Sequence, residues 1–116
     1  MSHKARTNFL VSAIAGAIAL SFSASAFAVD ATAAKVMARK NSCLRCHSVT
    51  KKKEGPSYQS VAYKYKDKSD AADVLIKHIT SGEKVKLTDG HQEEHKITKS
   101  KDPAEIKNLI DWILAQ

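Results

Sequence analysis

The chain has 116 residues, with 19 Lys and Arg against 12 Asp and Glu and a formal net charge of +7. This length favours one domain, and a chain with only two cysteines is not a disulfide-dense scaffold. Its one long apolar stretch, at the amino terminus, excludes a membrane protein with several spans.

The amino-terminal segment has the three parts of a secretory signal peptide. Two basic residues precede an apolar run over 9–20, and an A-x-A site for signal peptidase falls at 26–28. An uncleaved membrane anchor is the alternative, but the apolar run is short for spanning a bilayer. We therefore expect residues 1–28 to be removed by cleavage after Ala28. The mature domain, 29–116, is then exported to the periplasm without a membrane anchor.

The mature chain is predicted to be all-α, with four short helices and no convincing strand. The first helix is predicted over 30–40 and the second over 58–65, each from its capping and apolar residues. The third is predicted over 70–82, between an aspartate and a glycine that suit its two ends. Polar residues without periodicity fill 83–101, a loop length that is usually functional or mobile. The last helix follows a capping Asp102 and repeats apolar residues at helical spacing.

Cys43, Cys46 and His47 form a C-x-x-C-H motif, which is the attachment signature of c-type haem. Two cysteines at this spacing lie on one face of a helical turn, so both sulfurs can reach the two vinyl groups of one porphyrin and form thioether bonds. The adjacent histidine then binds the iron as its proximal ligand. Export supports this interpretation because haem is attached to such motifs outside the cytoplasm. The motif therefore predicts one covalent haem c.

The cysteine pair has three other interpretations. A redox dithiol needs a βαβ setting, which the pattern does not predict. A disulfide between Cys43 and Cys46 would close a very tight loop and stabilise little. A zinc site with His91 and His95 would need a gap of 44 residues between Cys46 and His91, far from the spacing of zinc fingers.

On these residues, the mature chain resembles a small bacterial class I c-type cytochrome. The resemblance covers essentially all of 29–116 and depends on the order of parts: helix, C-x-x-C-H, Gly55-Pro56, two helices, a ligand loop and a last helix with Trp112. It implies a small cytochrome c fold, in which the helices surround the haem and the first and last helices pack across each other. The expected contact brings Ala33, Ala34 and Met37 against Ile110 and Ile113, with Trp112 near the haem edge.

The resemblance also implies how the proximal histidine is held. In the family, the carbonyl of the proline in the Gly-Pro step accepts a hydrogen bond from that histidine. Carried over to this chain, Pro56 would hold His47 in the tautomer that binds iron. A plain turn at Gly55-Pro56 is the other interpretation, and the two are compatible.

The chain departs from the family at the second axial position of the iron. The family usually places a methionine in the loop before the last helix, but Met37 lies on the first helix and is assigned to the core. The family methionine keeps a set distance from the C-terminal aromatic residue, and seventeen residues before Trp112 lies His95. We therefore predict His95 as the distal ligand. His91 is the alternative, and an open or otherwise filled site is the third possibility.

This ligand set determines the expected function. A thioether ligand raises the haem potential, whereas a second imidazole favours ferric iron, so a lowered potential is expected. With both axial positions filled, the resemblance implies a one-electron carrier and not an enzyme. The alternative is a ligand-binding, sensing or peroxidase-like haem protein with a labile histidine. A haem subunit docked on a redox enzyme would show the same sequence features.

The remaining signals concern partners. In the family, the region of His78 approaches a haem propionate, so His78 either bonds a propionate or is a half-exposed helical histidine. Lysines at 51–53 and at 64, 66 and 68 are typical of solvated faces, but they also suit docking onto an acidic surface of a redox partner. Without an aromatic stacking platform, nucleic-acid binding is not expected. Nothing demands a dimer, so a monomer is expected.

Overall fold

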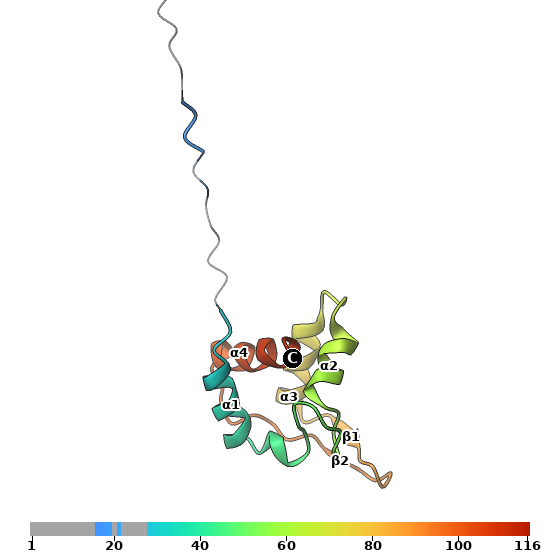
Figure 1. Cartoon of the computed structure of the whole chain (residues 1–116). Coiled ribbons are helices and arrows are strands. Elements are labelled where there is room, and N and C mark those ends of the chain that lie inside the picture. Colours follow the sequence, from blue (N-terminus) through green and yellow to red (C-terminus); the bar gives the residue numbers. More distant parts are fainter. Residues whose placement is uncertain (1–15, 20, 22–27) are drawn as a thin grey trace, which may run out of the picture.

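A computed structural model of the chain describes residues 16–19, 21 and 28–116. The predicted signal peptide, 1–28, therefore falls mostly outside the described residues. Within the described part, no helix is both long and apolar enough to cross a membrane. The elements follow in chain order (Figure 1): α1 (Ala31–Lys40), a 3-10 turn (Cys43–Arg45), α2 (Tyr58–Tyr65), α3 (Ala71–Ser81), β1 (Lys84–Lys86), β2 (Gln92–Glu94) and α4 (Pro103–Leu114).

Aspartate and glycine residues set the helix boundaries largely as the sequence predicted. The Asp30 carboxylate accepts a hydrogen bond from the Ala33 backbone N–H at 2.9 Å, and Asp102 does the same for Ala104 at the start of α4. Asp70 precedes α3 but makes no side-chain capping bond. Gly82 ends α3 with a φ of +69°, a conformation that side chains disfavour. Local capping therefore accounts for three of these four boundaries.

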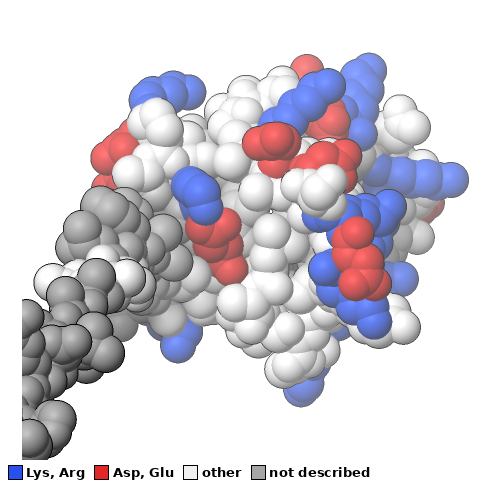
Figure 2. Space-filling model, turned by 90° about the horizontal axis from the view of Figure 1, so that it is seen from above, with Lys and Arg blue, Asp and Glu red and all other residues white. Residues whose placement is uncertain are grey.

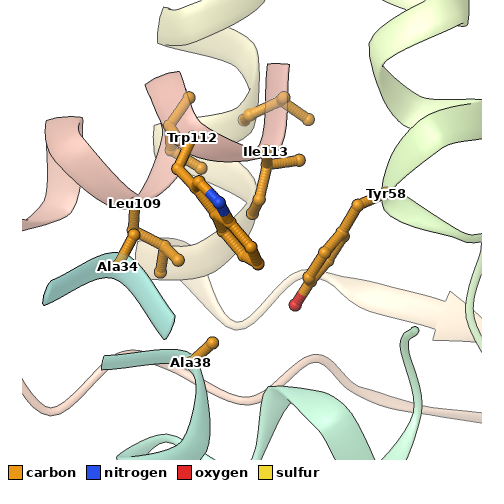
Figure 3. Packing of buried hydrophobic residues seen from close by; sticks show 8 residues of the cluster. Ala34, Ala38, Tyr58, Leu109, Trp112 and Ile113 are labelled. Carbon is orange, nitrogen blue, oxygen red and sulfur yellow. The ribbon is translucent and has the colours of Figure 1, made fainter. Parts of the chain in front are cut away.

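The core lies where α4 crosses α1, next to α2 and α3. Two alanines four residues apart on α1, Ala34 and Ala38, are buried and let the helices approach closely. Ala33, which the resemblance places in this contact, is exposed. Figure 3 shows how the cluster packs. Its buried members are Ala34, Ala38, Tyr58, Leu75, Leu109, Ile110, Trp112 and Ile113.

The loop between α3 and α4 contains a short antiparallel hairpin that the sequence did not predict. β1 pairs with β2 so that Lys84 lies opposite Glu94 and Val85 lies opposite Glu93. Each strand has three residues, and Val85 is the one residue among these six that is partly buried. The strands therefore lack the alternating apolar pattern from which a strand is predicted. Opposite charges at one pair and the positive φ of +93° at Gly90 favour the hairpin.

We expect Ile110→Ala to lower the free energy of unfolding of the holoprotein by roughly 2–5 kcal/mol. Ile110 is 1% exposed at the centre of the helix crossing, and truncation leaves a cavity that rigid neighbours cannot fill. Denaturant unfolding followed by circular dichroism measures the change. Val74→Ala is the control, because Val74 is 39% exposed and its truncation should cost much less. Equal losses at the two positions would contradict this assignment of the core.

Candidate functional site

A pocket opens between the C-x-x-C-H turn, the Gly-Pro step, α3, α4 and the hairpin. Cys43, Cys46, His47, His78 and His95 all line it. Its other walls are largely aliphatic: Val61, Leu75, Ile79, Val85, Leu87, Leu109, Ile110 and Ile113. The fold thus brings most of the predicted site residues to one apolar cavity.

The C-x-x-C-H segment forms a tight turn directly after α1. Ser42 adopts a left-handed φ of +58°, and the backbone N–H groups of Cys46 and His47 then bond to the Cys43 carbonyl at 3.2 and 3.0 Å. Both cysteine side chains lie on the pocket wall, and burial raises the pKa of the Cys43 thiol. The turn therefore presents both sulfurs and the histidine to the same cavity.

The other interpretations of the cysteine pair find no support in this geometry. The two thiols are not joined in a disulfide. The described strands form one antiparallel hairpin, so the described residues provide no βαβ setting for a redox dithiol. Among the same residues, no group of three or more His, Cys, Asp or Glu side chains could hold a metal ion, as a zinc site would require.

The His47 imidazole is fixed from three sides. Its Nδ1 donates a hydrogen bond to the Pro56 carbonyl at 2.7 Å, so Nε2 is the nitrogen available as a ligand. The ring stacks on Tyr58, with 5.4 Å between centroids and 20° between planes. A Cβ atom at Gly55 would lie 2.7 Å from Nδ1 and closer still to Cε1, so only glycine leaves room for this ring.

Tyr58 is a site residue that the sequence analysis did not identify. It is 3% exposed, and burial beside Cys43 raises the pKa of its hydroxyl. Its other neighbour is Trp112, at 5.5 Å between centroids and in an edge-on arrangement (Figure 3). Tyr58 lines the pocket and Trp112 does not, so Trp112 reaches the pocket only through its contact with Tyr58. The only sequence signal was an aromatic residue at the first position of a helix directly after the Gly-Pro step.

His95 lines the same pocket as His47. The two ring centroids are 6.2 Å apart. His95 Nδ1 donates to the Lys96 carbonyl at 3.0 Å, which again leaves Nε2 free. Burial, together with the nearby His78, lowers the pKa of His95, so the ring is neutral and competent to bind a metal at neutral pH.

His91 and His78 occupy different places. His91 is on the hairpin turn with an exposed side chain, its Nδ1 is 2.5 Å from Asp89 Oδ1, and it does not line the pocket. His78 is on α3 and does line it. The His78 ring centroid is 4.1 Å from that of His95, and its Nδ1 donates to the Glu83 carboxylate. The structure therefore brings His95 and His78 together and leaves His91 outside.

The predicted lysine groups lie on the surface. Lys66 Nζ sits 4.8 Å from the centre of the Tyr63 ring, and Lys64 and Lys68 flank Tyr65 in the same way. Tyr63 is 73% exposed. Figure 2 shows one face of the molecule, whose centre is largely uncharged and whose margins carry Lys and Arg side chains interspersed with Asp and Glu.

The residues of the pocket fit a covalently attached haem. Two metal–nitrogen bonds of about 2 Å, with the half-width of each imidazole ring added, span about 6 Å. The 6.2 Å between the His47 and His95 ring centroids matches that span. Aliphatic walls suit a porphyrin, and both thiols border the same cavity. The fold and the site together define a small, helical haem-attachment domain.

Comparison with known proteins gives the family. The Cytochrome c family model matches residues 31–116, so the chain belongs to the cytochrome c family, whose members bind one covalent haem c with its iron. Cys43, Cys46 and His47 are its C-x-x-C-H motif. The all-α cytochrome c fold and the haem c cofactor predicted from the sequence are thereby confirmed.

Individual relatives agree with this assignment. The class 1 cytochrome MtoD of Sideroxydans lithotrophicus has 57% identity and a TM-score of 0.73, over 76% of this chain and 97% of the other. Cytochrome c552 of Nitrosomonas europaea has 36% identity and a TM-score of 0.54, over 69% and 95%. Cytochrome c-552 of Hydrogenobacter thermophilus is 31% identical over 92% of this chain and 95% of its own.

Proposed function

We propose that this chain is an exported monohaem cytochrome that carries one electron at a time between redox partner proteins, with His47 and His95 as the two iron ligands. The observation that carries the proposal is that both imidazoles line the pocket, with 6.2 Å between their ring centroids. In each ring, a backbone carbonyl engages Nδ1 and leaves Nε2 for the metal. His95 thereby takes the position that methionine usually has in the family.

The protein groups around the haem have separate roles in this proposal. Cys43 and Cys46 hold the haem through thioether bonds. The bound haem supplies the one-electron couple of its iron. The Pro56 carbonyl fixes the tautomer of His47, and such outer contacts orient a ligand and raise its basicity. The Lys96 carbonyl does the same for His95.

Two imidazole ligands favour a carrier of lowered potential. Imidazole lacks the potential-raising effect of a thioether, so ferric iron is stabilised relative to methionine-ligated relatives. With His47 and His95 both bound, the haem would offer no open site for substrate, and the aliphatic walls of the pocket would surround it. The chain's own residues then hold the metal and make no bonds during turnover, which is the behaviour of an electron carrier and not of an enzyme.

The remaining parts of the proposal concern location and surface. The amino-terminal pattern supports cleavage after Ala28 and a periplasmic location. The lysines at 64, 66 and 68 support docking onto an acidic partner surface. His78 Nδ1 is engaged by Glu83, so a propionate contact from His78 would have to use Nε2.

We expect the purified holoprotein to have low-spin spectra in both oxidation states and, in the reduced form, to bind carbon monoxide only slowly and weakly. With His47 and His95 as ligands, the gas would bind only after one of them leaves the iron. The near-infrared charge-transfer band of methionine-bound ferric haem should be absent. Rapid, complete carbon monoxide binding would instead support the ligand-binding alternative, and a methionine band would contradict ligation by His95.

A further inference from the structure

Glu83 connects the two histidines on the distal side of the pocket. Its backbone carbonyl accepts a hydrogen bond from the His95 backbone N–H at 2.9 Å. Its carboxylate accepts a second bond, from His78 Nδ1. Glu83 directly follows Gly82, whose left-handed conformation turns the chain away from α3. Glu83, just past the end of α3, thus contacts both the loop that carries His95 and the side chain of His78.

His78 supports the His95 ring from the helix. Its ring lies 4.1 Å from that of His95 between centroids, with the planes tilted by 44°. The His78 side chain is 28% exposed, and the Glu83 side chain is 47% exposed. The Glu83 bond at Nδ1 restricts rotation of the His78 ring, so the ring presents the same face to His95. The His78 side chain, on helix α3, therefore limits the movement of the His95 side chain, which is on a loop.

The other bonds of His95 cannot provide this support. The bond from Nδ1 ends on the carbonyl of Lys96, the next residue, so it moves together with the loop. The hairpin just before His95 has two three-residue strands with largely exposed side chains. Such a segment opens at low free-energy cost. The Thr98 backbone N–H also bonds to the Ile79 carbonyl of α3 at 2.9 Å, but this bond holds the loop backbone three residues after His95. The contact with His78 is the one that relates the imidazole ring itself to α3.

We propose that His78 and Glu83 are positioning residues that hold the His95 imidazole toward His47 and the iron. This inference rests on the proposed ligation by His95. Its functional consequence is slow dissociation of a loop-borne ligand, which keeps the iron closed to small molecules and keeps the carrier six-coordinate in both oxidation states. His78 and Glu83 touch neither the iron nor a substrate in this role.

The test uses ferrous holoprotein and carbon monoxide, because the gas binds only as fast as the distal ligand leaves. We expect Glu83→Ala and His78→Leu each to raise the rate of carbon monoxide binding about tenfold, the scale of one lost charge-assisted hydrogen bond. The second readout is the low-spin electron paramagnetic resonance signal of the ferric form. It reports the angle between the imidazole planes, and it should broaden or shift in both variants. His78→Phe keeps a ring against His95 and should give an intermediate rate.

Asp89→Asn is the matched control. Asp89 forms the same kind of histidine–carboxylate pair with His91 in the same loop but outside the pocket. The Asp89→Asn variant should have the wild-type rate of carbon monoxide binding and the wild-type electron paramagnetic resonance signal. If the Glu83 and His78 variants also match the wild type, the positioning role is wrong. A shifted potential with unchanged rate and signal would instead assign His78 to a propionate contact. Persistence of the wild-type low-spin signal in His95→Ala would refute the proposed ligation itself.

Discussion

We expect His95→Ala to convert the ferrous holoprotein from one that resists carbon monoxide into one that binds it at least about 100-fold more tightly. Carbon monoxide can bind only to the fraction of molecules in which the His95 side chain has dissociated from the iron. A firmly bound imidazole keeps this fraction at about 1% or below, which weakens the apparent affinity for the gas by the same factor. Removing the imidazole removes the competition. Equilibrium titration of the reduced protein with the gas measures the difference.

His91→Ala is the control for this prediction, and it should behave like the wild type because His91 lies outside the pocket. The variant His78→Ala/His95→Ala guards against replacement of the lost ligand by the neighbouring ring, 4.1 Å away. His95→Met should raise the reduction potential in a spectroelectrochemical titration, because a thioether stabilises ferrous iron. An unchanged or lowered potential in that variant would overturn the proposed ligand set.

The parts of the site that the sequence predicted are those encoded in a few neighbouring residues. Cys43 to His47 determine the chemistry through their own spacing, and Asp30 and Asp102 cap helices through bonds two or three residues away. The family resemblance added Pro56, whose carbonyl does meet His47 in the structure. These features need no knowledge of how distant segments pack.

The parts that the sequence missed depend on contacts between segments or on weak local signals. Tyr58 stacks on His47 only because α2 begins beside the C-x-x-C-H turn. The pairing of Glu83 with His78 needs the turn at Gly82. The hairpin escapes prediction because its exposed three-residue strands carry no hydrophobic alternation. Local propensity specifies none of these three features.

We expect Gly55→Ala to destabilise the holoprotein by about 1–3 kcal/mol, as overpacking of a tight site does, and to disturb the proximal ligand. The added Cβ would lie 2.7 Å from His47 Nδ1 and 2.9 Å from Nε2, distances at which something must move. The backbone cannot easily yield, because the Gly55 N–H bonds to the Cys46 carbonyl at 2.7 Å. The ring cannot easily yield either, since Pro56 and Tyr58 hold it.

Denaturant unfolding and the ferric electron paramagnetic resonance spectrum together test this prediction. Gly90→Ala is the control, because Gly90 has a φ of +93° and open space around it, its nearest neighbour being Lys86 Cε at 3.9 Å. That variant should lose stability through backbone strain while its haem spectrum stays unchanged. In Gly55→Ala both quantities should change, because the space that glycine leaves is occupied by the proximal imidazole. A Gly55→Ala protein with wild-type stability and spectrum would show that this ring has room to move.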